Sequence, residues 1–403
     1  MDDAVAVVLD NGAYTAKVGL ATQDEPFLIP NCTMKAKAER RRIFVGNQID
    51  ECRDASSLFY QLPFQKGYLM DWEIERIVWD HIFSADGTGI LLEDRPIIIT
   101  EPMLNFPQIQ EAMVEILFED YHCSGVHKTT TAELAAYNYA AESEETPINS
   151  LNCIVVDVGY SFTHVVPFVK GKIVMKGVRR MDIGGKSLTN HMKELISYRQ
   201  LNMMDETYVV NQIKEDVCFV SQNFDMDMKA SKQKIGLVEY VLPDFTTVKR
   251  GYIRGGEAKK GENGNEIDED DKQILKLCNE RFTVPELLFT PIDVGIKQVG
   301  IPETIIDSLN SCPEVMHCEM LENIIVIGGS SNFKNFVPRL KKDLRALATD
   351  DLEVSLIFPD DSTSYGWYGG KELANSGDLN MYLLTREEYE ETGYTPNRKR
   401  KDN

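Results

Sequence analysis

Two short segments of the chain combine the residue types that a phosphate-binding site requires. Asp10-Asn11-Gly12 and Asp157-Val158-Gly159 each follow an apolar run, and the two aspartates lie 147 positions apart. A glycine in such a turn lets backbone N–H groups approach a polyanion, because it has no Cβ atom. Carboxylate oxygens are suited to hold the water ligands of Mg²⁺. Two such turns, facing each other across a cleft, could hold a nucleotide from both sides.

A third segment has a related pattern. The apolar run 324–327 opens into Gly328-Gly329-Ser330-Ser331. Any one of these three segments alone is typical of an ordinary tight turn. The three in this order are a more specific indication of a phosphate site.

Strands must position the first two turns. Apolar residues 4–9 and 15–21 flank the first turn, and residues 153–156 and 162–168 flank the second. Short β-branched runs bounded by turn residues predict buried strands. A strand–turn–strand unit that recurs at a domain-sized distance predicts two similar lobes.

Helical periodicity fills the intervening sequence. Ile74, Ile77, Val78 and Ile82 predict an amphipathic helix over 72–83. Three further helices are predicted around 109–117, 188–196 and 210–220, the last carrying Lys214 and Glu215. Strands alternating with helices predict an α/β fold with mixed sheets covered by helices.

Composition sets limits on function. The chain has 403 residues, of which 43% are hydrophobic, and a formal charge of −21. It can form a full-sized core, whereas its charge opposes nonspecific binding to DNA or anionic lipid. No run of 18 apolar residues is present, so no membrane partner is expected. Eight cysteines without a C-x-x-C pair predict reduced thiols of a cytosolic or nuclear protein.

Three charged segments interrupt the alternation of predicted strands and helices. Residues 35–42 are basic and predict an exposed loop that could touch DNA phosphates, although a solvated surface is an equal alternative. Residues 254–272 hold one isoleucine and no aromatic residue, which predicts a mobile acidic insertion. Arg398, Lys399, Arg400 and Lys401 form a basic run that suits a nuclear import signal or a solubilising end.

From end to end, apart from the acidic insertion and the basic tail, the chain resembles the actin family. The resemblance is carried by segments such as Leu9-Asp10-Asn11-Gly12, Ile99-Thr100-Glu101-Pro102, Asn279-Glu280-Arg281-Phe282 and Trp367-Tyr368-Gly369-Gly370. Gln65-Lys66-Gly67-Tyr68 and Ile196-Ser197-Tyr198-Arg199-Gln200 resemble the nuclear actin-related subunits of histone-exchanging complexes.

The resemblance implies an α/β, actin-like fold: two similar lobes of mixed β-sheet flanked by helices, four subdomains and a central cleft. Residues 1–152 would form the first lobe, with a small subdomain inserted at about 30–70. Residues 153–370 would form the second lobe, with an insertion subdomain at about 186–282 that contains the acidic loop 254–272. Residues 371–403 would return to the first lobe and end in the basic tail.

The resemblance also implies a site for ATP or ADP with Mg²⁺. The first lobe would contribute Asp10, Asn11, Gly12 and Lys17, and the second lobe Asp157 and Gly159. Lys214, Glu215, Gly328 and Gly329 would approach the adenosine. No side chain is expected to bind metal directly; Asp10 and Asp157 would act through metal-bound water.

Departures from the family pattern alter this expectation. Ala13-Tyr14 replaces Ser-Gly in the first turn, and Tyr160-Ser161 replaces Asp-Gly in the second. Thr131 aligns with the glutamine that orients hydrolytic water, and Thr363 and Phe333 lie near the adenine-side lysine and tyrosine. Since positioning water is most of what such a hydrolase contributes, hydrolysis is not expected. Whether the cleft holds nucleotide, or is filled by Tyr14 and Tyr160, stays open. His164 is expected to be a packed residue.

The function implied by the resemblance is that of a non-catalytic, nuclear, monomeric subunit. Its complex would exchange the Z variant of histone two-A into nucleosomes. Expected partners are a remodelling ATPase, a small zinc-finger subunit, the nucleosome or its histones, and heterochromatin protein one. The alternatives are an ATP-binding, slowly hydrolysing regulator of assembly and a cytoskeletal actin-related protein.

Overall fold

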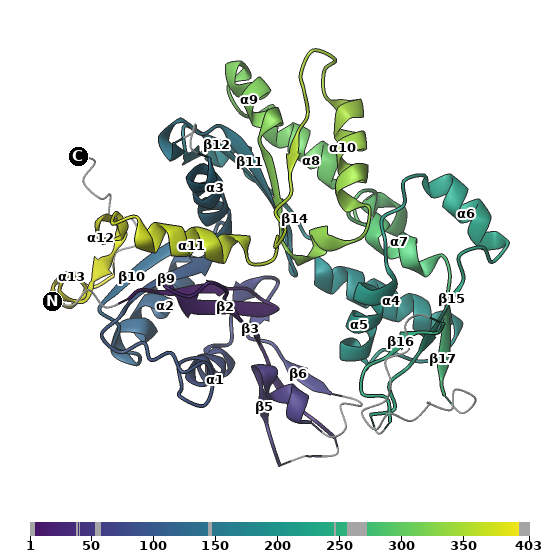
Figure 1. The fold of residues 1–403 in the computed structure, drawn as a ribbon, viewed down its shortest axis with the longest axis horizontal. Coiled ribbons are helices and arrows are strands. Elements are labelled where there is room, and N and C mark those ends of the chain that lie inside the picture. Colours follow the sequence, from purple (N-terminus) through teal and green to yellow (C-terminus); the bar gives the residue numbers. More distant parts are fainter. Residues whose placement is uncertain are drawn as a thin grey trace.

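The computed structural model describes residues 5–37, 39, 41–52, 58–143, 147–245, 247–255 and 272–394. The chain forms two lobes, each built on a six-stranded sheet, with smaller sheets in two further regions (Figure 1). This arrangement confirms the predicted α/β fold with two similar lobes.

The first lobe contains the sheet β20-β10-β9-β1-β2-β3. Its strands are β1 (Val7–Asn11), β2 (Thr15–Leu20), β3 (Phe27–Pro30), β9 (Pro96–Glu101), β10 (Gly125–Thr130) and β20 (Leu384–Thr385). Val7 and Leu9 point to a core formed with α1 (Trp72–Ile82) and α2 (Pro107–Glu119). Val8, between them, points to the opposite face and packs with α3 (Thr131–Glu142) and α11 (Tyr365–Asn375). Helices therefore cover both faces of the sheet.

The second lobe repeats this plan with the sheet β13-β12-β11-β18-β19, to which β14 adds beside β12. Its strands are β11 (Cys153–Val158), β12 (Thr163–Val169), β13 (Lys172–Ile173), β14 (Arg179–Met181), β18 (Ile324–Ile327) and β19 (Leu356–Ile357). One face packs against α4 (Gly185–Arg199), α8 (Ile301–Leu309) and α10 (Phe336–Leu347). The other face packs against the alanines of α3, which thus lies between the two sheets.

The two predicted strand–turn–strand units are present and equivalent. β1 pairs antiparallel with β2 and parallel with β9, while β11 pairs antiparallel with β12 and parallel with β18. Asp10 lies opposite Lys17, and Asp157 lies opposite His164, at the same register position. Both turns therefore begin at the carboxyl end of a central strand.

The small subdomain follows β3. It consists of β4 (Thr33–Lys35), β5 (Phe44–Val45), a 3₁₀ helix (Gly46–Glu51), β6 (Phe59–Gln61) and the hairpin β7 (Phe64–Gln65) and β8 (Tyr68–Leu69). The basic segment 35–42 is only partly the exposed loop that was predicted, because Lys35 belongs to β4 and Ala36 is buried. Arg42 is not a free cation either, since it pairs with Glu51 and lies over the Phe44 ring.

The insertion subdomain extends the second lobe. It contains α4, α5 (Thr207–Val217), α6 (Phe224–Lys232), β15 (Val238–Val241), β16 (Tyr252–Ile253), β17 (Ile274–Leu277) and α7 (Glu280–Glu286). The helix predicted over 210–220 ends at Val217, and the Val220 N–H bonds instead to the Lys334 carbonyl. Most of the acidic segment 254–272 lies outside the described residues.

The C-terminal part returns to the first lobe. Helix α11 follows α9 (His317–Glu322) and α10, and it packs against α3 and β1. The expected boundary at residue 370 therefore falls inside α11, which packs with the first lobe. α12 (Leu379–Tyr382), β20 and α13 (Arg386–Thr392) follow. The basic residues 398–401 lie outside the described residues. In the described part of the chain, no helix has the length and apolar character needed to cross a bilayer.

Candidate functional site

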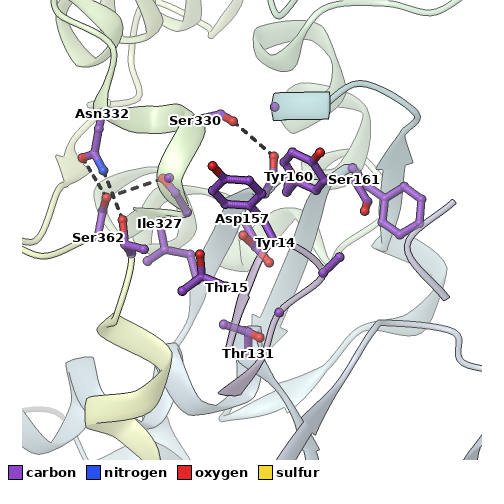
Figure 2. A pocket seen from close by; sticks show the side chains of 18 of the residues that line it. Tyr14, Thr15, Thr131, Asp157, Tyr160, Ser161, Ile327, Ser330, Asn332 and Ser362 are labelled. Atoms are coloured by element: carbon purple, nitrogen blue, oxygen red, sulfur yellow. Dashed lines mark hydrogen bonds between the residues drawn. The ribbon is translucent and has the colours of Figure 1, made fainter. Parts of the chain in front are cut away.

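A cavity of about 1010 Å³ lies between the two lobes (Figure 2). The carboxyl ends of β1, β11 and β18 open into it, because central strands of two facing sheets place their terminal turns at the same cleft. All ten residues predicted for the nucleotide site line this cavity: Asp10, Asn11, Gly12, Lys17, Asp157, Gly159, Lys214, Glu215, Gly328 and Gly329. The structure therefore brings together residues that are more than 300 positions apart in sequence.

The carboxylate of the first turn is fully engaged. Asp10 is 2% exposed and its Oδ2 accepts from Lys17 Nζ at 2.9 Å. Its Oδ1 accepts from the hydroxyl of Thr100 at 2.7 Å and from that of Thr131 at 3.1 Å. Thr131 is placed by the start of α3, where Thr130 and Glu133 form a capping box. The positive end of that helix adds to the field around Asp10.

The carboxylate of the second turn has a different environment. Within the described residues no side chain donates a hydrogen bond to Asp157, and its cross-strand neighbour is His164 rather than a lysine. Burial, reinforced by the charge of Asp10, raises the pKa of Asp157 to about 7. Lys17 acts in the opposite direction on this pKa but does not outweigh burial. Both aspartates line the same cavity, and the charge of Asp10 acts on Asp157.

His164 is packed, as predicted. It is 7% exposed, and its ring meets the edge of Phe162 with centroids 5.2 Å apart. Burial, together with the charge of Arg180, lowers its pKa to about 4, so the imidazole is neutral at physiological pH. Its Nε2 has no hydrogen-bond partner among the described residues. A neutral ring cannot balance the charge of Asp157.

Two tyrosine rings lie between the turns. Tyr14 of the first turn stacks on Tyr160 of the second, with ring centroids 4.7 Å apart and an interplanar angle of 30° (Figure 2). The Tyr14 hydroxyl accepts from Asn211 Nδ2 of α5 at 2.9 Å. Tyr14 lines the cavity and is 40% exposed. Burial of its hydroxyl, together with the charge of Glu215, raises the pKa of Tyr14 well above the ordinary range. The two rings therefore contact each other directly, and Tyr14 and Tyr160 both line the cavity.

The segment that follows β18 packs against the second turn. Gly328 has a φ of +95°, and a Cβ atom there would lie 2.5 Å from the Val158 carbonyl oxygen and 2.8 Å from Asp157 Oδ1. Only glycine permits this contact. Ser330 Oγ donates to the Gly159 carbonyl at 3.2 Å, and this hydrogen bond joins the segment after β18 to the second turn. Gly329 has more room, since its nearest neighbour would be 3.9 Å away.

Lys214 and Glu215 line the cavity but are committed to neighbours within the insertion subdomain. Lys214 Nζ donates to Asn211 Oδ1 at 2.8 Å and to Thr189 Oγ1 at 3.0 Å. Burial lowers the pKa of Lys214. Asn211 Nδ2 donates to Glu215 Oε1 at 2.7 Å. Asn211 thereby links the predicted adenosine-side residues to Tyr14.

Sequence reasoning missed a buried polar network behind the first turn. Asn11 Nδ2 donates to Glu75 Oε1 at 2.6 Å, and Asn31 Nδ2 donates to Asn11 Oδ1 at 3.1 Å. Glu75 of α1 is fully buried, and burial raises its pKa to about 7. Its other oxygen has no partner in the described part of the chain. The available signal was a glutamate within the apolar stripe of α1, which ordinary amphipathic periodicity does not explain.

The remaining sequence-based assignments are also placed. Thr363 and Phe333 line the cavity near Asn332, which donates to the Thr363 hydroxyl at 3.2 Å. Thr131, which the resemblance aligns with the family's water-orienting glutamine, lines the cavity, and its hydroxyl donates to Asp10. No group of three or more His, Cys, Asp or Glu side chains among the described residues could hold a metal ion directly.

Comparisons with known proteins assign the chain to a family. The family model for actin matches residues 1–401. Actin-related protein 6 of Drosophila melanogaster is 61% identical over 394 residues, which cover 96% of this chain and 97% of that protein. Actin-like protein ARP6 of Cryptococcus neoformans is 40% identical and covers 96% of this chain and 82% of its own. Actin-related protein 6 of Arabidopsis thaliana is 34% identical, with 98% of each chain covered. The chain belongs to the actin family and, within it, is similar to proteins named actin-related protein 6.

Proposed function

We propose that the chain is a non-catalytic actin-fold subunit of a chromatin-remodelling complex that exchanges the Z variant of histone two-A into nucleosomes. The similarity to actin-related protein 6 over nearly the whole chain supports the assignment to this type of subunit. The observation that carries the non-catalytic part is the Tyr14–Tyr160 stack between the two turns.

The side chains at the two turns support the proposal that no triphosphate binds between them. Two aromatic rings stack between the turns, and Lys17, which would contact phosphate, is paired with Asp10. Thr131 offers a short hydroxyl, engaged with Asp10, in place of a glutamine amide. A residue that cannot reach or orient a water molecule cannot supply the positioning on which such hydrolysis depends. The proposed function therefore includes no hydrolytic step.

Mass spectrometry of the denatured, purified protein tests this directly. We expect neither ATP nor ADP to be released, and no turnover of Mg-ATP above a buffer control. The variant Tyr14→Gly/Tyr160→Gly should gain nucleotide binding, because it opens the space between the turns. Tyr198→Ala is the matched control, since that ring is 91% exposed and far from this stack in sequence. Stoichiometric nucleotide in the wild-type protein would overturn the proposed lack of nucleotide, and turnover of Mg-ATP would overturn the non-catalytic assignment.

The second candidate is an ATP-binding protein that hydrolyses slowly. The volume of the cavity favours it, because about 1010 Å³ exceeds what a drug-sized ligand requires and the adenosine-side residues still line it. Turnover that is abolished by Asp10→Ala or Asp157→Ala would establish this function instead.

The proposal includes partners and assembly state. A remodelling ATPase and a small zinc-finger subunit would bind the chain, and the complex would bring it to nucleosomes, their histones and heterochromatin protein one. The chain would act as a monomer within such assemblies rather than form filaments. Salt-dependent sedimentation of the purified protein would contradict this, whereas copurification with the ATPase would support it. Depletion of the chain should lower the amount of the histone variant in chromatin.

We also propose that the protein acts in the nucleus, with some cytoplasmic protein. The support is the basic run Arg398, Lys399, Arg400 and Lys401. Deleting residues 398–401 should reduce nuclear fluorescence of a tagged chain. Unchanged localisation would discard this run as an import signal.

A further inference from the structure

Three aromatic contacts join the first lobe to the second across the cleft. The first is the Tyr14–Tyr160 stack, which connects the two turns directly. The hydrogen bond from Asn211 to the Tyr14 hydroxyl extends this contact to α5 of the insertion subdomain. One side chain of the first lobe thus contacts two separate elements of the second.

The second contact lies between the small subdomain and the insertion subdomain, which are neighbours in Figure 1. Tyr60 of β6 stacks on Tyr208 of α5, with centroids 6.4 Å apart and an interplanar angle of 28°. Tyr208 and Phe245 also pack against the buried core of the small subdomain. The insertion subdomain therefore supplies side chains to a core that belongs to the other lobe.

The third contact is made by the β7–β8 hairpin. Gly67, at a φ of +71°, lies so close to the Phe162 ring of the second lobe that a Cβ atom would be 2.0 Å from it. The Tyr68 ring is 5.9 Å from Phe162, and its hydroxyl accepts from Arg180 Nη1 at 2.7 Å. The Arg180 guanidinium lies 3.7 Å over the Phe162 ring. A tilted ring contact, a hydrogen bond and a cation–π contact act together here.

These contacts join the two lobes through side chains of the chain itself. A ligand that contacts both lobes stabilises closure only when it is bound, whereas side chains of the chain itself are always present. Each contact alone is modest, but all three resist the same motion, so their contributions to closure reinforce one another.

We propose that Tyr14, Tyr60 and Tyr68, with the second-lobe rings that they contact, form a clamp that holds the two lobes closed without any ligand. The chain then presents both lobes to a partner as one rigid surface. This inference does not depend on histone exchange or on the absence of hydrolysis.

Hydrogen exchange and small-angle X-ray scattering of the full-length protein test the clamp. The wild-type protein should have the same radius of gyration with and without Mg-ATP, and the same amide exchange in residues 11–15, 64–69 and 207–217. Tyr14→Ala/Tyr60→Ala/Tyr68→Ala should enlarge the radius of gyration. It should also accelerate exchange in those segments by about tenfold or more, because local opening becomes easier.

Single variants keep the test valid if the triple variant fails to fold. Tyr60→Ala should accelerate exchange in α5, whereas Tyr60→Phe, which retains the ring, should behave like the wild type. Tyr198→Ala controls for the loss of an exposed ring. Folded single alanine variants whose amides exchange at the wild-type rate would overturn the clamp. A wild-type radius of gyration equal to that of the triple variant would overturn it as well. Binding of ATP without a change in radius would instead refute only the proposed lack of nucleotide.

Discussion

The two glycine-containing turns share a backbone plan but differ in how their aspartates are stabilised. Asp10 lies opposite Lys17 in the β1–β2 register and accepts three side-chain hydrogen bonds. Asp157 lies opposite His164, whose ring is neutral, and it accepts none from the described side chains. Because no described side chain stabilises the carboxylate by a hydrogen bond, burial raises the pKa of Asp157 to about 7.

The difference shows that a recurring local motif determines where a carboxylate lies but not what charge it carries. The backbone of each turn follows from its apolar strands and its glycine. Ionisation depends on partners from other elements: β9 and α3 supply hydroxyls to Asp10, whereas the charge of Asp10 itself acts against ionisation of Asp157. A buried charge is tolerated where it is paired and costly where it is not.

The largest effect is expected from the paired aspartate. Asp10→Asn leaves the Lys17 ammonium without its carboxylate, and breaking a buried pair costs about 3 kcal/mol or more. Asp157→Asn removes an unpaired carboxylate, so at pH 8 it should change the free energy of unfolding by less than about 1 kcal/mol or increase it. Urea denaturation of both variants at pH 8 measures the contrast. Equal losses would contradict the distinction between the turns.

A backbone change can perturb the second turn alone. Gly328→Ala should cost about 2–3 kcal/mol, because its φ of +95° is strained for alanine and the new Cβ meets the Val158 carbonyl. Gly329→Ala is the matched control and should stay within about 0.5 kcal/mol, since that position has room. The same denaturation assay applies. If Gly328→Ala left the free energy of unfolding unchanged, the turn would have to shift without cost.

The pH dependence of stability should reflect the raised carboxyl pKa values. The folded state keeps Asp157 and Glu75 protonated up to about pH 7, above their ordinary values of 3.8 and 4.5. Between those values and about 7 the folded state binds more protons than the unfolded state, so this contribution to stability is full below pH 4 and is lost as pH rises through 7.

Glu75→Gln isolates one part of that dependence. A glutamine retains an acceptor for Asn11 and cannot ionise, so it should stabilise the protein at pH 8 by on the order of 2 kcal/mol. It should also flatten the decline of stability between pH 5 and 8 (roughly the window set by the raised pKa). Unfolding curves across this range provide the measurement. A glutamine variant that is less stable than the wild type at pH 8 would argue that the ionised network is favourable.

The smallest effect concerns the Thr131 hydroxyl, which the resemblance aligns with the family's glutamine. Thr131→Ala removes one of three hydrogen bonds to Asp10 and should cost about 1 kcal/mol. Thr131→Ser keeps the hydroxyl and should recover most of that loss. If serine and alanine are equally destabilising, the threonine methyl group rather than its hydrogen bond matters.

Much of the fold was accessible from the sequence. Alternation of apolar runs and glycine turns predicted both hairpins, and helical periodicity predicted α1, α2, α4 and α5. The end of α5 was misplaced, because Val220 is apolar and buried yet its N–H bonds to the Lys334 carbonyl rather than within the helix. Periodicity detects burial, and it cannot tell which backbone a buried residue bonds to.

The sequence by itself determined the two carboxylate turns, their residues and the bulky substitutions beside them, because these depend on short-range pattern. Only the tertiary structure decided that Tyr14 and Tyr160 stack, that Glu75 lies behind Asn11, and that Lys214 bonds within its own subdomain. The first of these contacts joins the two lobes, the second joins α1 to β1 within the first lobe, and Lys214 joins α5 to α4 through Thr189. Their distances and their effects on pKa arise from long-range geometry and burial, which no local pattern encodes.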